Sequence, residues 1–326
     1  MGEKKITSIG GQAVIEGVMM RGPHKTAVAV RKPDGEIIID EKETKSIGKW
    51  AKIPIIRGCV AFISSMVTGV QALMFSAKFF DVEEEEKNKK SKNKDVDNAL
   101  SDDKNEKNEK NKKDDKEESI PEWMLYISVL LAVCMSVGLF IVLPNVISNL
   151  FVPNREQNPV IYNLVESVVK VIIFLGYLVL VSKMKDIQRT FEYHGAEHKT
   201  IFCYENGEEL TPENVKKYSR FHPRCGTSFL LFVVIISIIV FSLVGVYKNP
   251  FINMGLRLLL LPLVAGISYE IIKFAGRSKN KCITWLNAPG KWLQRFTTRE
   301  PDEKQIEVAI ASLKAVIPEN KDDDRW

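Results

Sequence analysis

Two histidines and a glutamate occupy one short segment of the chain, at His194, Glu197 and His198. Because the two histidines are four residues apart, a helix places both on the same face, one turn from each other. That spacing allows both imidazoles to bind one divalent metal ion, and zinc is the usual ion at such sites. Glu197 is suited to take a proton from a metal-bound water as a general base. The segment therefore predicts a metal site with hydrolytic chemistry.

A second pair of metal-binding side chains follows at His222 and Cys225, three residues apart. Three of the four histidines in the chain therefore lie between residues 194 and 222. His194, His198, His222 and Cys225 together provide the four donors of a tetrahedral zinc site, with Cys203 as a spare thiolate. Three protein ligands and a water make such a site catalytic, whereas four make it structural. A third interpretation, polar residues of an ordinary loop beside the membrane, remains open.

Four apolar segments are long enough to cross a lipid bilayer, for which about 20 helical residues suffice. Residues 53–80 are also mostly apolar but contain Arg57, and we expect an interfacial or re-entrant helix there, with a spanning helix as the alternative. The expected fold class is an α-helical multi-pass membrane protein with about four transmembrane helices and a small cytoplasmic α+β portion. The four predicted spans are residues 123–146, 160–182, 228–247 and 256–274.

The basic residues of the connecting segments indicate the orientation of these helices. Residues 183–227 and 273–281 are rich in Lys and Arg, whereas the two opposite loops have one basic residue each, Arg155 and Lys248. Since cytoplasmic loops carry the excess of basic residues, we expect both termini and the histidine cluster in the cytoplasm. The N-terminal residues precede no apolar segment, so no signal peptide is expected.

Residues 81–118 contain 15 acidic and 11 basic side chains and almost nothing apolar. Such a segment cannot bury enough surface to offset its ordering entropy, so we expect a disordered linker over 81–122. The rest of the chain carries a net positive charge that favours anionic lipid headgroups. We therefore expect the lipid bilayer as a partner and no nucleic acid.

The two ends of the chain show patterns of smaller elements. The alternation of Thr26–Arg31 and Glu36–Asp40 around a Pro-Asp-Gly turn predicts two paired strands. The glycine-rich residues 10–23 before them are interpreted as tight turns around Glu16 and Arg21, which form either a structural ion pair or part of a substrate site. Near the other end, apolar residues at helical spacing over 302–317 predict an amphipathic helix packed on the cytoplasmic portion.

These patterns divide the chain into segments that differ in composition. They are a β-containing segment at 1–52, the apolar segment at 53–80, the charged linker at 81–122, a first transmembrane hairpin at 123–182, a loop with the metal-site residues at 183–227, a second hairpin at 228–276 and an amphipathic cytoplasmic region at 277–326.

Four longer stretches of the chain resemble the YqhQ family of bacterial membrane proteins. That family is uncharacterised, and its members are grouped as predicted metal-dependent enzymes. The resemblance implies a multi-pass protein of the bacterial inner (plasma) membrane with a metal site on the same four donors, and it implies no particular substrate. The matching stretches are residues 10–22, 192–199, 220–228 and 297–302.

The order H-x-x-E-H is also that of the inverted-zincin metallopeptidases. This resemblance is much narrower, because those enzymes are large soluble proteins whose third ligand is a distant glutamate. Gly195 within the motif weakens a helix by about 1 kcal/mol relative to Ala. Glu205, Glu208, Glu209 and Glu270 are all candidates for the third ligand, and none is distinguished by its position. We therefore interpret the pattern as convergence.

The first functional hypothesis is a membrane-bound, zinc-dependent hydrolase at the cytoplasmic membrane interface. In it, His194, His198 and His222 hold the metal, and Cys225 is a fourth ligand or supports the other three. Glu197 is the base. The substrate class would be a membrane protein or membrane-anchored peptide, or a lipid headgroup.

Two other hypotheses remain open. One is a non-enzymatic scaffold or assembly factor whose four-ligand metal site is structural. The other is a small transporter with Glu166 and Lys170, which are one helical turn apart in the second apolar segment, in its pathway. Arg257 and Glu270 are nearer the ends of the fourth segment, where we expect them to extend towards the membrane surface.

Overall fold

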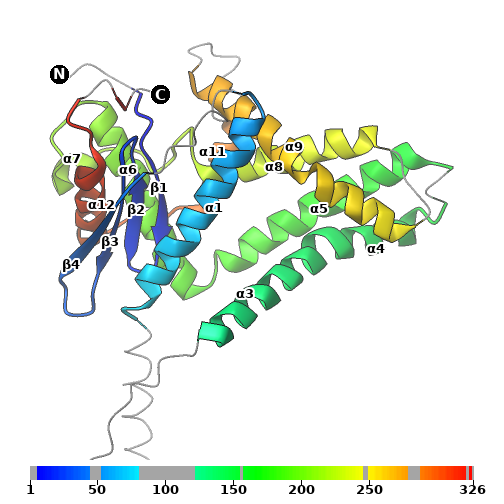
Figure 1. The fold of residues 1–326 in the computed structure, drawn as a ribbon, viewed down its shortest axis with the longest axis horizontal. Helices are drawn as coiled ribbons and strands as arrows, with labels where there is room; N and C mark the ends of the chain where they lie inside the picture. The colour runs from blue at the N-terminus through cyan, green and yellow to red at the C-terminus, as the bar shows by residue number, and fades with distance from the viewer. Residues whose placement is uncertain are drawn as a thin grey trace, which may run out of the picture.

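A small sheet with two helices lies at one end of the molecule, and a group of long apolar helices extends from it (Figure 1). Helix α1 (Ile56–Ala77) lies between these two parts (Figure 1). Except for Glu122, the predicted linker at 81–122 lies outside the described residues. The computed structural model describes residues 6–44, 53–80, 122–154, 157–244, 249–277, 287–320 and 323–324.

The sheet is antiparallel, with its strands in sequence order: β1 (Gly10–Val14), β2 (Gly17–Arg21), β3 (Lys25–Arg31) and β4 (Ile37–Glu43). The predicted pair of strands is confirmed as β3 and β4. The interpretation of residues 10–23 as a set of turns is wrong, because most of them form the β1–β2 hairpin. A Cβ at Gly11 would lie 2.6 Å from the carbonyl oxygen of Met19, so this glycine permits close strand packing.

The two faces of the sheet are covered by different helices. On one face, α6 (Lys185–Glu205) and α12 (Glu303–Val316) form a core with the inward residues of β2 and β3. On the other face, the end of α1 contributes Ala72, with Phe75 packed beside it, to a second cluster. The predicted C-terminal amphipathic helix is confirmed as α12, which begins with a capping box at Asp302 and Gln305.

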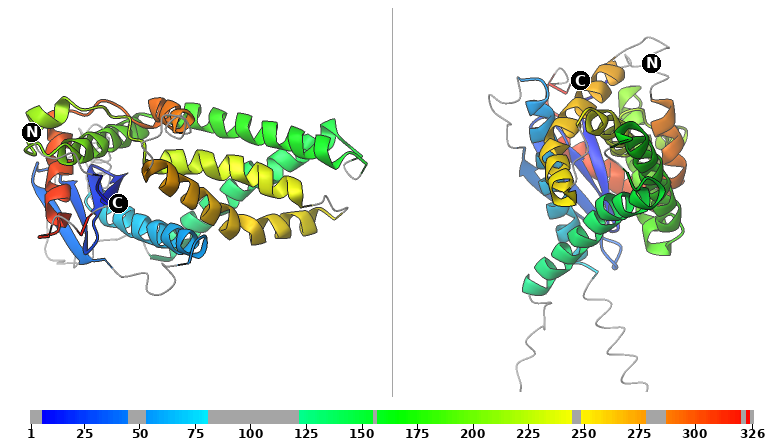
Figure 2. Two further views of the ribbon diagram at one scale, coloured as in Figure 1. Left: turned by 90° about the horizontal axis from the view of Figure 1, so that it is seen from above. Right: turned by 90° about the vertical axis from the view of Figure 1, so that its right-hand side faces the viewer.

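The long helices form two hairpins whose loops lie far from the sheet (Figure 2). The first hairpin consists of α3 (Glu122–Val137), the π-helical segment η2 (Gly138–Val142), α4 (Leu143–Phe151) and α5 (Pro159–Val181). The second consists of α8 (Gly226–Leu243) and α9 (Pro250–Arg277). Two shorter helices, α7 (Pro212–Lys216) and α11 (Ala288–Thr297), lie at the end near the sheet.

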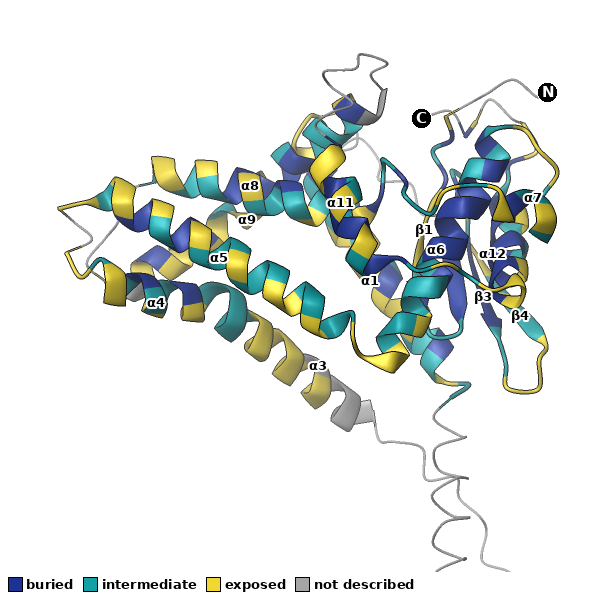
Figure 3. Ribbon diagram, turned by 180° about the vertical axis from the view of Figure 1, so that it is seen from behind, coloured by how far each residue is buried: buried dark blue, intermediate teal, exposed yellow. Residues whose placement is uncertain are grey.

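Within the described residues, five helices are long and apolar enough to cross a membrane, one more than the four expected. Four correspond to the predicted spans, and the fifth is α1. Exposed residues cover much of α3, α4, α5, α8 and α9, whereas α6 and α12 are buried where they face the sheet (Figure 3). Many of these exposed residues are large and apolar, among them Leu131, Leu150, Leu180, Leu243 and Leu259.

Three charged side chains meet between α5 and α9. Lys170 Nζ lies 2.9 Å from Glu166 Oε1, as the spacing predicted. The expectation that Arg257 extends to the membrane surface is wrong, because its guanidinium donates two hydrogen bonds to the buried Glu166 carboxylate. Glu270 instead pairs with Arg57 of α1. This pair fixes the start of α1 against α9.

Candidate metal centre

Helix α6 carries both histidines of the motif, and residues 183–227, which were expected as a loop, are therefore largely helical. Gly195 lies in the middle of α6 despite its low helix propensity. A Cβ there would collide with the carbonyl oxygen of Arg299, whose amide donates to Phe191 O at 2.9 Å. Gly195 thus allows the segment after α11 to pack directly on α6.

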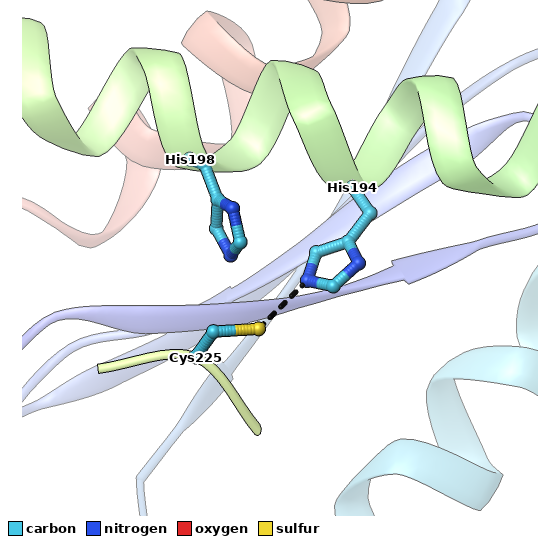
Figure 4. A group of neighbouring side chains, drawn as sticks. All are labelled: His194, His198 and Cys225. Carbon is cyan, nitrogen blue, oxygen red and sulfur yellow. Dashed lines mark hydrogen bonds between the residues drawn. The ribbon is translucent and has the colours of Figure 1, made fainter. Parts of the chain in front are cut away.

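His194, His198 and Cys225 face one another (Figure 4). The Nε2 atom of His194 lies 3.2 Å from Cys225 Sγ, and the two imidazole centroids are 4.4 Å apart. One donor atom from each of the three residues lies within 4.8 Å of the other two. This is the only such group found among the described residues. Side chains from α6 and from the residue that caps α8 therefore converge on one point.

The Nδ1 atoms of both histidines are held by backbone carbonyl groups. His194 Nδ1 is 2.8 Å from Thr297 O, and His198 Nδ1 contacts Arg220 O. Since a carbonyl only accepts hydrogen bonds, each Nδ1 carries a proton, and Nε2 is the ring atom of each histidine that faces the cluster and could bind a metal. Metal-binding histidines are commonly oriented in this way by a backbone carbonyl.

Cys225 caps the N-terminus of α8, where its Sγ accepts a hydrogen bond from Thr227 N at 3.4 Å. Burial favours the neutral thiol, but His194 and His198 outweigh it and hold the pKa of Cys225 well below its usual value. Burial likewise opposes charge on His194, but the neighbouring Cys225 raises the pKa of that imidazole to about 9. The two histidines therefore favour the thiolate of Cys225, the form that binds metals.

His222, the other predicted donor, lies beside this group and is not part of it. Its ring centroid is 5.5 Å from that of His198, its Nδ1 accepts from Arg224 N at 3.3 Å, and its Nε2 is 3.7 Å from Glu205 Oε2. Burial lowers the pKa of His222 to about 4. The side chain of Gln294 bonds both the N–H and the C=O of His222, each at 2.7 Å.

Glu197 is 4% exposed, and its Oε2 lies 3.9 Å from His194 Nε2 with no hydrogen-bond partner. The backbone of Gly11 in β1 contacts the same carboxylate, and a hydrogen bond from it favours the charged form. Burial has the larger effect and raises the pKa of Glu197. A buried oxygen without a partner is costly, so Glu197 is positioned for a ligand or proton that the protein itself does not supply.

The three donors and Glu197 line a cavity of about 530 Å³. Its other walls come from the β1–β2 hairpin, including Gly11 and Arg21, and from Ser65 and Thr68 of α1. The hairpin residues Gly10, Gly11 and Gln12 are exposed on this side. The cluster is thus open to a space large enough for a small molecule.

The remaining predicted candidates lie elsewhere. Cys203 is in the core between α6 and the sheet, where burial raises its pKa to about 11. Glu205 accepts hydrogen bonds from Thr7 N and Arg224, and Glu270 pairs with Arg57. Glu16 does not pair with Arg21, because Arg189 and Tyr193 of α6 bind its carboxylate.

Four supporting residues were not predicted from the sequence. Gly11, Arg220 and Thr297 each contribute a backbone group, and all three lie in stretches that the resemblance to the YqhQ family had marked. Gln294 carried no such signal, because a single glutamine in an amphipathic segment resembles many surface residues. Only its complete burial reveals its role.

The five apolar helices indicate a membrane protein, and the His-His-Cys group gives it a candidate metal site beside its sheet. A family model described as "Protein of unknown function (DUF1385)" matches residues 53–319. The chain is 34% identical over 317 residues to the "Uncharacterized protein YqhQ" of Bacillus subtilis (strain 168), with 94% of this chain and 92% of that protein covered. The chain therefore belongs to the DUF1385 family, which confirms the resemblance to YqhQ proteins. No solved structure matches the chain.

Proposed function

We propose that the protein is a multi-pass protein of the bacterial plasma membrane, with the sheet and the cluster on the cytoplasmic side. The exposed apolar surface of the long helices supports insertion, because such a surface is stable in lipid and costly in water. The distribution of basic residues supports the orientation. Arg189 and Lys199 of α6 lie at the end near the sheet, whereas the loops at the far end have one basic residue each.

At this interface the protein acts as a zinc-dependent hydrolase. The observation that carries the proposal is that three donors, His194, His198 and Cys225, converge on the wall of a cavity beside the unpartnered oxygen of Glu197. Three protein donors leave a fourth tetrahedral position for water, which is the arrangement of catalytic zinc sites. The fit of the donors to zinc is good, because thiolate and imidazole are its preferred ligands.

In this hydrolase His194, His198 and Cys225 would hold the zinc, which would supply the acidity of the attacking water and the polarisation of the substrate. Glu197 would accept a proton from the attacking water and later donate it to the leaving group. Its buried position suits this role, because burial raises the pKa of Glu197 above its usual value. Thr297 and Arg220 hold the two imidazoles in place through their carbonyl oxygens.

The alternative to a catalytic site is a structural metal site, in which His222 would be the fourth ligand. Its ring is buried 5.5 Å from that of His198, so a rotation that breaks its contacts with Arg224 and Glu205 would bring in a fourth ligand. A site closed in this way has no position for water and would fix α6 to the loop before α8. The protein would then be a scaffold or assembly factor.

A second candidate function follows from the contact between Cys225 and His194. A thiolate at a helix N-terminus, 3.2 Å from an imidazole nitrogen, is also the arrangement of a cysteine nucleophile with its base. This candidate requires no metal. It differs from the hydrolase in predicting that Cys225 reacts with an alkylating reagent in the protein as purified.

Metal content and coordination distinguish these functions. We expect about one zinc per chain in protein purified in detergent without chelators, with X-ray absorption giving one sulfur at about 2.3 Å and two nitrogens with an oxygen at about 2.0–2.1 Å. His194→Ala/His198→Ala should lack the metal, and His24→Ala, which changes an exposed histidine, should retain it. Four protein ligands would support the scaffold. No metal, together with a Cys225 that is alkylated at pH 7, would overturn both metal proposals.

A further inference from the structure

A second cavity adjoins the metal-site cavity and differs from it in character. It measures about 540 Å³ and lies between α1, α8 and α9, where mostly apolar side chains such as Phe62, Val70 and Phe229 line it. The two cavities share five lining residues, so they are adjacent. The shared residues are Gln12, Ser65, Arg224, Cys225 and Gly226.

The polar cavity contains a cation, Arg21, that pairs with no carboxylate of the described residues. Arg21, at the end of β2, is half-buried, lines this cavity and donates to Ser64 Oγ at 3.1 Å, its one side-chain hydrogen bond among the described residues. The other arginine of the wall, Arg224, is paired with Glu205. A half-buried guanidinium without a counter-ion favours binding of an anionic group from outside the protein.

The geometry points to a phospholipid as the occupant of both cavities: its phosphate headgroup lies with Arg21 in the polar cavity, and an acyl chain lies between α1, α8 and α9. The wall that the two cavities share at Ser65 and Cys225 supports one ligand that is polar at one end and apolar at the other. The positive charge of Arg21 supports a ligand with an anionic headgroup. All three helices are among the candidate spans, so the apolar cavity is within reach of the bilayer in which such lipids are dissolved.

This inference names the substrate class of the proposed hydrolase and rests on that function only for what happens after binding. The headgroup would lie in the same cavity as His194, His198, Cys225 and Glu197. Binding itself depends on Arg21, which is not one of the three donors, and on the apolar cavity, whose wall includes Cys225 but neither His194 nor His198. Lipid affinity and metal content are therefore separate measurements.

The test is lipid binding to the detergent-purified full chain, measured by native mass spectrometry with phosphatidylglycerol and, in parallel, with diacylglycerol, which has the same chains and no phosphate. Arg21→Gln should weaken binding of phosphatidylglycerol by about 10-fold or more and leave that of diacylglycerol unchanged, because a hydrogen bond to a charged group is lost. Ser65→Trp, which fills the junction, should weaken both lipids. Ile63→Trp is the matched control, since Ile63 is 58% exposed on the same helix and lines neither cavity.

Each other outcome has a defined meaning. Equal affinity of wild type and Arg21→Gln for phosphatidylglycerol, in a variant with unchanged melting temperature, would overturn the inference. So would equal losses in Ser65→Trp and Ile63→Trp, or displacement of the lipid by an apolar transmembrane peptide but not by a short-chain phospholipid. If the lipid pattern holds but no zinc is present, the lipid site stands and the hydrolase fails. If zinc is present and the lipid pattern is absent, the lipid site fails and the hydrolase proposal stands.

Discussion

Cys225 differs from the two histidines of the cluster, because it contributes the only negatively charged donor. Its removal takes away both a ligand and the charge that offsets the metal, so Cys225→Ala should lower zinc affinity by at least about 100-fold, beyond the 10- to 100-fold typical of supporting residues. Cys203→Ala removes an equally buried thiol outside the cluster and should retain the metal. Titration with a competing chelator measures both variants. Equal affinities would exclude Cys225 as a ligand.

Glu197 is placed to act on a bound water and not to hold the metal. Its Oε2 is 3.9 Å from His194 Nε2, and the carboxylate is not part of the three-donor group. We therefore expect Glu197→Gln to keep zinc at wild-type stoichiometry, with a melting temperature that is no lower, because a costly buried charge is removed. Hydrolysis, once a substrate is found, should be lost. Loss of zinc in this variant would instead identify Glu197 as a ligand.

At the scale of single residues, the spacing in the sequence identified candidate metal donors but could not decide which of them meet. The four-residue interval between His194 and His198 marked two side chains that meet, whereas Cys225, which joins them, was marked only by its spacing from His222. Spacing alone also marked His222, but its ring is held by Glu205 and by the backbone of Arg224. That outcome depends on where Glu205 of α6 meets the loop before α8, a tertiary contact that no local pattern encodes.

Helix α6 depends on a glycine in its middle. Since a Cβ at Gly195 would collide with Arg299 O, Gly195→Ala should displace the segment that also supplies Thr297 O to His194. We expect a loss of about 1–3 kcal/mol in stability, as for other overpacked sites, together with weaker zinc binding. Gly176→Ala in α5, where a Cβ meets nothing within 4 Å, is the matched control and should lose neither. Equal behaviour of the two variants in thermal melting and metal analysis would contradict this account.

The three charges between α5 and α9 lead to an ordered prediction. Removing Glu166 leaves Lys170 and Arg257 facing each other without a counter-ion, whereas removing Arg257 leaves the Glu166–Lys170 pair intact. Glu166→Gln should therefore lower the melting temperature in detergent more than Arg257→Met does, because an unpaired buried charge costs about 3–5 kcal/mol. The opposite order would show that Lys170 alone does not compensate the buried charge of Glu166 once Arg257 is removed. The transport hypothesis for this group stays a prediction.

At the scale of the whole molecule, strong periodic or apolar patterns were predicted well and close contacts between distant segments were not. The four long apolar segments and the amphipathic spacing from Ile306 to Leu313 identify helices without reference to anything else. The β1–β2 hairpin was missed because Gly11 and Gly17, which signal turns when considered alone, here permit close contact between strands. The position of α1 was equally unpredictable, because it depends on a sheet face that the linear pattern does not reveal.

The position of α1 sets the topology of the membrane protein that we propose. Its first residues pair with α9 through Arg57 and Glu270, and its last turns cover the sheet through Ala72 and Ser76, whose Oγ lies 3.3 Å from Ile15 N. Since the sheet is proposed to lie in the cytoplasm, the end of α1 lies there too. This helix then enters the interface without crossing, although it is apolar enough to span.

Accessibility of introduced cysteines to a membrane-impermeant maleimide tests this topology. In intact cells, Asn154→Cys, in the loop between α4 and α5, should be labelled, whereas Glu36→Cys, between β3 and β4, and Glu319→Cys, after α12, should be labelled only when the cells are permeabilised. All three positions are exposed, so differences in labelling report the side of the membrane and not burial. The wild-type chain measures the background from its own cysteines. Labelling of Glu36→Cys in intact cells while Glu319→Cys stays protected would mean that α1 crosses the bilayer. The sheet that α1 covers would then lie outside the cell, separated from the C-terminal helix that packs on its other face, and because α12 and β3 share one core, that result would contradict the fold itself.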